Sequence, residues 1–289
     1  MWPQTASRIS RKVLLMSVHT TAKRITVPQL RAYKNQKKIV SLTSYTAPFA
    51  RVLDEYLDMI LIGDSTAMVG YNMENTLAIT LEQMAAHARA VVRSTQNVCV
   101  VVDMPFGSYQ ESPEQAFRNA AFLLKESGAD AVKYEGGTPL AATTRFLVDR
   151  GIPVLAHIGL MPQYLNTMGG FKAQGMSDEA AEIIYQDALS QEQAGAFAVV
   201  IEGTAEPLAR RITQALSIPT IGIGASPECD GQILVAEDIF NLTPNRIPKF
   251  ARQFSDVQAA IREGVAAYAT EVREGTFPTL DHCFGVKKK

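Results

Sequence analysis

Short apolar runs rich in β-branched residues alternate along the chain with longer amphipathic segments, and this alternation strongly limits the possible folds. The apolar runs are hydrophobic throughout instead of alternating in polarity, which is typical of parallel strands covered on both faces. Seven of these runs follow one another: KKIVSLTSY, MILIGDS, VCVVVDMPF, AVKYEGG, IPVLAHIGL, FAVVIEG and IPTIGIGAS. The series predicts a (β/α)8 barrel, an α/β fold, with the eighth unit within the stretch that runs from GQILVAEDIFNL to IPKF.

The helical segments carry start signals at their N-termini. Thr80 with Gln83, and Ser112 with Gln115, match the capping box, in which the hydroxyl accepts from a first-turn N–H and the amide reaches back to the cap. In the helix that begins at Leu81, apolar residues recur with the helical period. An open doubly wound sheet is the alternative fold, but it calls for a glycine-rich phosphate loop, and SLTSYTAPFA after the first strand contains no glycine.

The N-terminal arm differs in composition from the rest of the chain, because no Asp or Glu occurs before Asp54 while Lys and Arg are frequent. A basic, acid-poor arm is typical of an organellar transit peptide. The alternatives are an ordinary extension, or an upstream start with Met16 as the true first residue. We expect residues 1–24 to be a poorly ordered basic extension, and residues 25–289 to form one barrel domain with a C-terminal helix.

Overall charge and cysteine content exclude several classes of protein. The net charge of −1 and the absence of a strongly basic face disfavour a nucleic-acid partner. No apolar run is long enough to span a bilayer, so we expect no membrane association. Three widely spaced cysteines form neither a zinc pattern nor a CxxC pair, and they favour a reducing, cytoplasmic location.

Five successive apolar runs have an ionisable residue at or near their ends. In a barrel the C-terminal ends of the strands meet at one mouth, where active sites lie. The sequence therefore predicts one site from residues that are distant along the chain: Asp64, Asp103, Glu135, His157 and Glu202.

Three of these residues are predicted to hold a metal ion. Asp64, Asp103 and Glu135 would repel one another unless a cation or a shared proton neutralised them. Oxygen-only ligands of this kind suit Mg²⁺, which binds one or two carboxylates and retains water or substrate oxygens. The alternative is that Asp64 only caps a turn and Asp103 a helix.

Other polar residues at the mouth are candidates for binding an anionic substrate. Lys133 stands two residues before Glu135, so both side chains would point into the barrel. Lys133 could hold a carboxylate or an oxyanion, or form a structural ion pair with Asp103. Ser65 could donate a hydrogen bond to the same anion, or be an ordinary turn residue. His157 could contact the ligand, transfer a proton or be a hydrogen-bonded core residue.

Glu202 is the candidate general base, because a carboxyl group among apolar neighbours has the raised pKa that this role needs. Its alternative is a helix cap or an ion pair with Arg210 or Arg211. The long loop MPQYLNTMGGFKAQGMSDE contains flexible glycines and is interpreted as a lid, with disorder as the alternative. Together these residues indicate a Mg²⁺-dependent enzyme that enolises an α-keto acid.

The chain resembles the ketopantoate hydroxymethyltransferase family over about residues 27–254. The motifs that carry the resemblance are IGDS, VDMPFGSY, PEQAFRNA, VKYEGG, AHIGLMPQ, GGFKAQG, IPTIGIGA, CDGQILV and IPKFARQF. The resemblance implies a barrel of the phosphoenolpyruvate-binding type. It also implies transfer of a hydroxymethyl group from 5,10-methylenetetrahydrofolate to 3-methyl-2-oxobutanoate, giving 2-dehydropantoate for pantothenate synthesis.

Residue roles follow from the same resemblance. Asp64, Asp103 and Glu135 correspond to the Mg²⁺ site, and Ser65 and Lys133, with Asp64 and Asp103, to the keto-acid contacts. Glu202 corresponds to the proton acceptor. The family implies a cytoplasmic homo-oligomer, often a decamer, although fungal and plant relatives are mitochondrial.

Two rival functions remain. A Mg²⁺-dependent lyase of the same barrel type would need a nucleophile, often a cysteine on a mobile loop, and the long loop has none. A non-catalytic binding protein would have lost the acidic set, which is present here.

Overall fold

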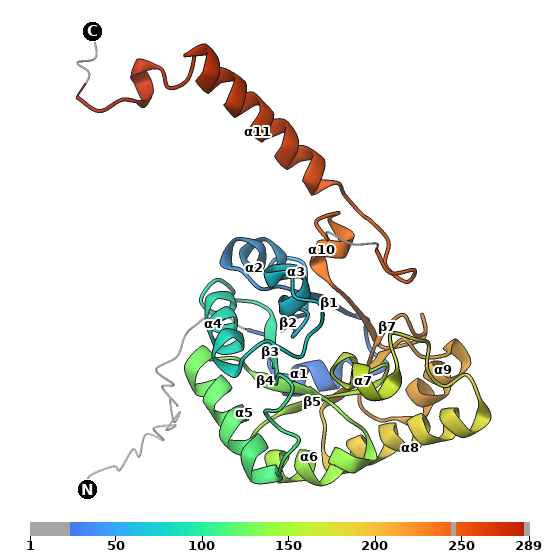
Figure 1. The fold of residues 1–289 in the computed structure, drawn as a ribbon. Helices are drawn as coiled ribbons and strands as arrows, with labels where there is room; N and C mark the ends of the chain where they lie inside the picture. The colour runs from blue at the N-terminus through green and yellow to red at the C-terminus, as the bar shows by residue number, and fades with distance from the viewer. Residues whose placement is uncertain (1–23, 244–246, 286–289) are drawn as a thin grey trace, which may run out of the picture.

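The protein folds as a closed barrel of eight strands in sequential order, all parallel to their neighbours (Figure 1). The structure, a computed structural model, describes residues 24–243 and 247–285. The barrel confirms the predicted fold, and the open-sheet alternative is wrong. The strands are β1 (Ile39–Thr43), β2 (Met59–Ile62), β3 (Cys99–Asp103), β4 (Ala131–Glu135), β5 (Val154–Gly159), β6 (Ala198–Glu202), β7 (Thr220–Ile223) and β8 (Gly231–Leu234).

The predicted eighth strand closes the barrel against the first. Gly231 of β8 lies in register with Ile39 of β1. A Cβ atom on Gly231 would stand 2.6 Å from the carbonyl oxygen of Ile39, so the close approach of the two strands requires glycine. The alternation of strands and helices is interrupted between β7 and β8, because the described residues 224–230 form a loop and contain no helix.

Helices surround the barrel on its outer side (Figure 1). The α-helices are α1 (Val27–Ala32), α2 (Ala47–Leu53), α3 (Thr66–Tyr71), α4 (Leu81–Val92), α5 (Pro113–Ser127), α6 (Ala141–Val148), α7 (Leu165–Met168), α8 (Asp178–Ala194), α9 (Glu206–Ala215), α10 (Ala236–Ile239) and α11 (Val257–Glu274). Short 3-10 turns are η1 (Thr138–Leu140), η2 (Pro162–Tyr164) and η3 (Leu280–His282).

The two predicted capping boxes have different outcomes. Thr80 and Gln83 form the reciprocal pair at the start of α4, which confirms the first. At α5 the Ser112 hydroxyl accepts from the backbone of Gln115, but the Gln115 side chain accepts from Glu111 N and donates to Gly107 O. The second prediction is therefore right for the hydroxyl and wrong for the amide, because the preceding loop offers Gln115 other partners.

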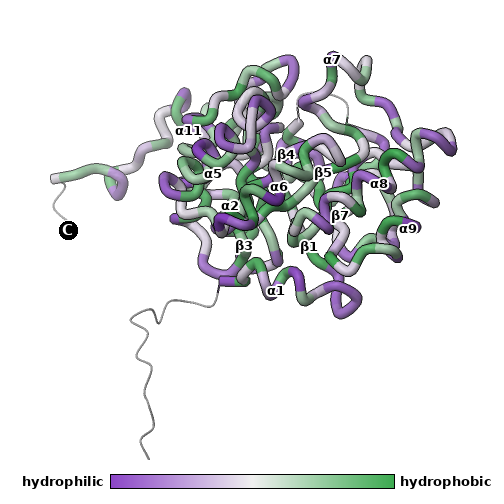
Figure 2. Tube along the Cα trace, turned by 90° about the horizontal axis from the view of Figure 1, so that it is seen from below, coloured by the Kyte–Doolittle hydropathy of each residue, from purple (hydrophilic) through white to green (hydrophobic). Residues whose placement is uncertain are grey.

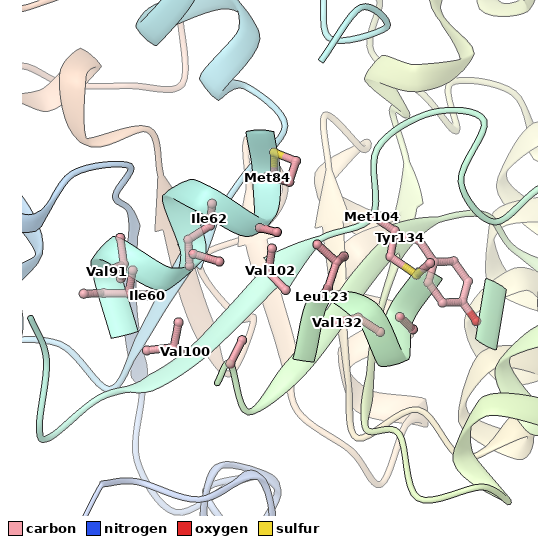
Figure 3. Close-up of a cluster of buried hydrophobic side chains, with 14 of the residues drawn as sticks. Ile60, Ile62, Met84, Val91, Val100, Val102, Met104, Leu123, Val132 and Tyr134 are labelled. Atoms are coloured by element: carbon pink, nitrogen blue, oxygen red, sulfur yellow. The ribbon is translucent and has the colours of Figure 1, made fainter. Parts of the chain in front are cut away.

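Alternate residues of each strand pack on opposite sides of the barrel wall, as the pleat dictates. Figure 2 shows hydrophobic stretches on strands such as β1 and β3 and hydrophilic stretches on the outer turns. Outward-facing residues pack against the helices, where Met84, Val91 and Leu123 meet strand residues (Figure 3). The strand residues in this layer are Ile60, Ile62, Val100, Val102 and Val132. Inward-facing residues form a separate core that includes Met59, Leu61, Val101, Leu155 and Val200.

Helix α1 covers the N-terminal end of the barrel. Leu30 of α1 is fully buried and packs with the inward-facing core, flanked by the partly buried Ile25, Val27 and Tyr33. The Arg24 guanidinium anchors the start of this segment by donating to Thr95 O at 2.8 Å. The inner core is therefore continuous with α1 at the N-terminal end of the barrel.

Helix α11 extends away from the barrel, as Figure 1 shows in red. None of its eighteen residues is buried. Ile261, Val265, Tyr268 and Val272 are all exposed apolar residues, and their spacing of three and four places them on one face of the helix. Within the described part of the single chain, Tyr268 packs edge-on against Phe277, and all four residues of the stripe stay exposed.

The predicted extension, residues 1–24, lies outside the described residues apart from Arg24. Within the described part of the chain, no helix combines the length and the hydrophobicity needed to cross a bilayer.

Candidate active site

The five ionisable residues predicted at the strand ends all lie at the C-terminal mouth of the barrel. Asp103, Glu135 and Glu202 are the last residues of β3, β4 and β6, and His157 lies in β5. Asp64 follows β2 by two residues. Asp103, Glu135, His157 and Glu202 continue the inward-facing series of their strands, because residues two apart share a face. Asp64 has the parity of the outward-facing Ile60 and Ile62, so it reaches the mouth from the turn after β2 and not from the pleat of the strand. The barrel therefore places the five side chains above the inner core.

Lys133 forms the central ion pair of this group. Its Nζ lies 2.7 Å from Asp103 Oδ1, and both side chains are almost completely buried. Burial alone would lower the pKa of Lys133, but Asp103, Asp64 and Glu135 outweigh it and raise the pKa above its usual value. The ammonium group therefore stays charged. The structural ion pair considered as an alternative exists, and Lys133 also lines the cavity described below.

The carboxyl groups around Lys133 are crowded and shielded from water. Burial raises the pKa of Asp103 to about 6, with Lys133 opposing and Asp64 adding to the increase. Burial and the neighbouring Asp64 raise the pKa of Glu135 well above its usual range. The Asp64 backbone N–H donates to Asp103 Oδ2 at 3.0 Å, which keeps these two residues together.

This charge balance fits a divalent cation. In the part of the chain that the structure describes, the ammonium group of Lys133 is the one cationic side chain near four carboxyl groups, those of Asp64, Asp103, Glu135 and Glu202. Among these residues, carboxyl groups therefore outnumber cations. Within the described ranges, no three His, Cys, Asp or Glu side chains converge to enclose an ion by themselves. The arrangement therefore suits Mg²⁺, which binds to one or two carboxylates and completes its shell with water or substrate oxygens.

Gln163 is a site residue that the sequence reasoning did not single out. Its side-chain amide nitrogen donates to Asp64 Oδ2 at 2.9 Å and to Met104 O at 3.0 Å. Its backbone N–H donates to Glu135 Oε2 at 2.8 Å. One residue of η2, in the loop after β5, therefore holds two of the predicted metal ligands. The only signal in the sequence is its place in the motif AHIGLMPQ, because an uncharged residue in a loop shows no periodicity.

Tyr109 supports Gln163 from the other side. Its hydroxyl donates to Gln163 Oε1 at 2.7 Å, and its ring packs against Tyr134 with 4.9 Å between the ring centroids. This bond fixes the Gln163 amide so that its nitrogen points at Asp64. Tyr109 belongs to the motif VDMPFGSY, but the hydrogen bond from its hydroxyl group to Gln163 was not predicted from the sequence.

His157 lies between the predicted metal ligands and the predicted base. Its Nε2 is 2.9 Å from Leu160 O and 3.4 Å from Glu202 Oε2, and its Nδ1 is 3.8 Å from Glu135 Oε1. Burial and the charge of Lys133 lower the pKa of His157 well below its usual value, so the ring is neutral. A carbonyl oxygen only accepts, which places the ring proton on Nε2 and leaves Nδ1 as an acceptor.

Glu202 has the electrostatic character expected of a general base. Burial raises its pKa to about 8; Lys133 opposes this, while Asp64 and Asp103 add to it. Its side chain lines the cavity and is 16% exposed. The alternative ion pair is wrong, because Arg210 pairs with Glu206 and Arg211 with Glu182.

Ser65 is held beside Asp64 by a tyrosine from the first strand end. Tyr45 Oη and Ser65 Oγ are 2.8 Å apart, and Ser65 lines the cavity. The serine hydroxyl therefore has a fixed position from which it can reach a bound anion.

A cavity of 1310 Å³ opens above these groups. Its inner walls carry six of the seven predicted site residues: Asp64, Ser65, Lys133, Glu135, His157 and Glu202. Asp103 does not line the cavity and instead contacts Lys133 and Asp64. The loop predicted to be a lid contains η2 and α7, and part of it lines the cavity.

Comparison with known proteins identifies the family. The family model described as ketopantoate hydroxymethyltransferase matches residues 24–280. A 3-methyl-2-oxobutanoate hydroxymethyltransferase of Parvibaculum lavamentivorans is 57% identical over 273 residues, which cover 94% of this chain and 99% of the relative. The protein of the same name from Agrobacterium fabrum is 52% identical over 273 residues, covering 94% of this chain and 98% of the relative.

Solved structures share the fold at much lower identity. A 2,3-dimethylmalate lyase of the PEP mutase/isocitrate lyase superfamily aligns with a TM-score of 0.56 and 18% identity, covering 91% of this chain and 90% of that chain. A phosphonopyruvate hydrolase in complex with oxalate and Mg²⁺ aligns with a TM-score of 0.58 and 12% identity, covering 89% of this chain and 93% of that chain. These structural similarities show the barrel fold alone. The sequence match also covers the residues at the mouth of the barrel, and it shows that the chain belongs to the ketopantoate hydroxymethyltransferase family.

Proposed function

We propose that this protein transfers a hydroxymethyl group from 5,10-methylenetetrahydrofolate to 3-methyl-2-oxobutanoate, giving 2-dehydropantoate for pantothenate biosynthesis. Relatives above 50% identity over 94% of the chain carry the name of this activity. The observation that carries the proposal is the position of Glu202, a carboxyl group of raised pKa that lines the same cavity as Lys133 and the acidic cluster.

The keto acid is oriented by the inner end of the cavity. The Lys133 ammonium and the Ser65 hydroxyl are the donors available to its carboxylate and keto oxygens. Asp64, Asp103 and Glu135 would hold Mg²⁺, with Gln163 fixing Asp64 and Glu135. Mg²⁺ bound there supplies positive charge that lowers the cost of an enolate. The phosphonopyruvate hydrolase of the same fold, solved with oxalate and Mg²⁺, supports a divalent ion.

Glu202 then takes the proton from C3 of the keto acid. Water hydrolyses the methylene bridge of the folate, so both carbon–nitrogen bonds break, tetrahydrofolate leaves and the one-carbon unit is released as formaldehyde. The enolate carbon then forms the new bond to the formaldehyde carbon, and the resulting alkoxide takes up the proton held by Glu202 to become the hydroxymethyl group. His157, neutral and beside Glu202, contributes an N–H next to the base without a competing positive charge.

The lyase alternative finds no support at the mouth. Among the described residues, no cysteine lines the cavity, and Cys99 and Cys229 are buried in the core. The remaining Cys283 is exposed near the C-terminus.

We further propose that the enzyme is a cytoplasmic homo-oligomer, as the family resemblance implies, with a decamer as the expected size. The exposed apolar stripe of α11 supports association with further copies, because a stripe of this kind favours burial against another surface.

Deuterium exchange at C3 of 3-methyl-2-oxobutanoate tests the function. We expect purified protein to catalyse this exchange in the presence of Mg²⁺ and without folate, as followed by NMR. Absence of exchange with and without Mg²⁺ in folded protein would contradict the enolising role and favour the lyase or a non-catalytic function.

A further inference from the structure

Two motifs that the keto-acid chemistry does not use meet at the rim of the cavity. GGFKAQG contributes Phe171 and Lys172, and IPKF contributes Lys249 and Phe250. These segments are far apart in the sequence, yet all four side chains line the cavity that also holds Glu202. The rim therefore carries two aromatic rings and two ammonium groups.

The first segment is attached to the chain just beyond Glu202. Gln174 N donates to Gly203 O at 2.8 Å, and Ala205 N donates to Gln174 O at 3.0 Å. Gln174 and Thr204 form an isolated parallel bridge. Because Gly203 follows Glu202 directly, Phe171 and Lys172 are held on the Glu202 side of the mouth.

The second segment reaches the same side from the neighbouring strand. Ile223 of β7 is the register partner of Glu202. A Cβ atom on the next residue, Gly224, would stand 2.7 Å from Phe250 Cδ1, and Gly224 has a φ of +59°. The ring of Phe250 thus lies against the end of β7, where glycine leaves space for it.

A buried carboxyl group completes this part of the cavity. Asp238 of α10 is only 5% exposed and lines the cavity. Burial raises its pKa, and a hydrogen bond from Thr243 opposes this. Neither Lys172 nor Lys249 forms an ion pair with a carboxylate in the described part of the chain, and neither does Asp238 with a cation.

The cavity is also too large for the keto acid alone. Its 1310 Å³ exceeds the roughly 300–1,000 Å³ of ordinary small-molecule pockets. A small branched keto acid held at Lys133 leaves most of this volume free. The free volume can therefore take a second, larger substrate.

We propose that Phe171, Lys172, Asp238, Lys249 and Phe250, here called the outer subsite, bind the folate co-substrate. The pteridine ring packs on the aromatic side chains, and its 2-amino and N3–H groups donate to the Asp238 carboxylate. The carboxylates of the glutamate tail face Lys172 and Lys249. This assignment rests on the proposed function, because it takes the methylene donor to be a folate.

The position of the outer subsite agrees with the chemistry. The carbon–carbon bond forms at C3, the atom that has just lost its proton to Glu202. The methylene carbon must therefore arrive beside Glu202, and both rim segments are attached there. Folate bound at the rim would also cover the keto acid and keep water from the enolate.

The first experiment compares Asp238→Asn with Asp149→Asn, a change in an exposed residue outside the cavity. Tetrahydrofolate binding is measured by calorimetry on the full-length protein with Mg²⁺ and keto acid present. We expect Asp238→Asn to weaken binding by about 10-fold or more, because the amide presents a donor to the donating edge of the pteridine. The Asp149→Asn protein should bind as the wild type does. Wild-type affinity in Asp238→Asn would overturn the role of Asp238.

The second experiment tests the lysines with folates of different tail length. In wild-type protein we expect tetrahydropteroyl-triglutamate to bind more tightly than the monoglutamate. The double variant Lys172→Ala/Lys249→Ala should lose this difference, while Lys125→Ala on α5 keeps it. An unchanged difference in the double variant would place the tail elsewhere.

Folate-independent C3 exchange separates the two hypotheses. If the wild type catalyses exchange but the outer-subsite variants bind tetrahydrofolate normally, the subsite is wrong and the function stands. If the wild type catalyses neither exchange nor transfer, the proposed function itself fails.

Discussion

The side-chain amide of Gln163 donates a 2.9 Å hydrogen bond to Asp64, while the backbone N–H of the same residue holds Glu135. Each carboxylate thus has one oxygen engaged by Gln163. Both oxygens of Asp103 are engaged as well, by Lys133 and by Asp64 N. The acidic cluster is therefore ordered by donors of the protein itself before any ligand binds.

Replacing Gln163 should weaken binding of a divalent ion. In Gln163→Leu the Asp64 carboxylate loses its donor and its fixed orientation, and outer-shell changes of this kind cost about 10–100-fold in metal affinity. Titration with Mn²⁺ followed by electron paramagnetic resonance measures this affinity without turnover. Gln186→Leu, on the exposed face of α8, is the control. Equal Mn²⁺ affinity in both variants would show that Gln163 does not position the ligands.

Replacing the base should separate binding from proton transfer. Glu202→Gln preserves the shape of the side chain but cannot accept the C3 proton. We expect keto-acid binding by calorimetry to persist while C3 exchange falls by about 100-fold or more. Exchange at the wild-type rate in this variant would remove Glu202 from the role of base.

The pH dependence of exchange should follow the raised pKa of Glu202. A base works only when deprotonated, so the rate should increase as the pH rises toward the pKa of Glu202, which burial raises to about 8 before a divalent ion binds. A bound cation favours the carboxylate and should move the midpoint to lower pH. Rates measured between about pH 6 and pH 9, with deuterated solvent and fixed ionic strength, provide the test. A profile that is flat, or that declines across this range, contradicts the assignment.

The Lys133–Asp103 ion pair should be needed for stability as well as binding. Lys133→Met leaves Asp103 buried without its cation, and breaking a buried pair in this way costs about 3–5 kcal/mol. Thermal unfolding should therefore show a marked loss of stability. The double variant Lys133→Met/Asp103→Asn should recover part of that loss, yet still bind the keto acid weakly. No recovery would mean that Lys133 stabilises the barrel through other contacts.

The apolar stripe of α11 should control the oligomeric state. Val265→Asp/Tyr268→Asp places two charges in the middle of the stripe, whereas Glu263→Ala changes an exposed residue of the same helix. Sedimentation should show that the double variant dissociates to smaller species while Glu263→Ala assembles normally. Because no α11 residue is buried in the single chain, the fold of the barrel should be unaffected. Unchanged assembly of the double variant would exclude the stripe as an interface.

The sequence allowed prediction of the barrel and of the charged mouth because both follow from short-range periodicity. Lys133 and Glu135 share a face through the pleat of one strand, and the topology brings Asp64, Asp103 and Glu202 to the same end. Gln163 could not be predicted in this way, since its position depends on how a long loop folds back over two other strands. Asp238 likewise could not be predicted, because it lies in the four-residue helix α10, which is too short for a periodicity to indicate the direction of a side chain.

Helix α1 covers the N-terminal end of the barrel, and this has a consequence for the kinetics. With Leu30 packed into the inner core below the mouth residues, a keto acid held at Lys133 lies deeper in the cavity than a donor bound at the rim. The reactant that binds deeper must therefore bind before the reactant at the rim, and its product must leave after it. Steady-state kinetics should therefore be compulsory-ordered, with the keto acid leading and the larger one-carbon donor following.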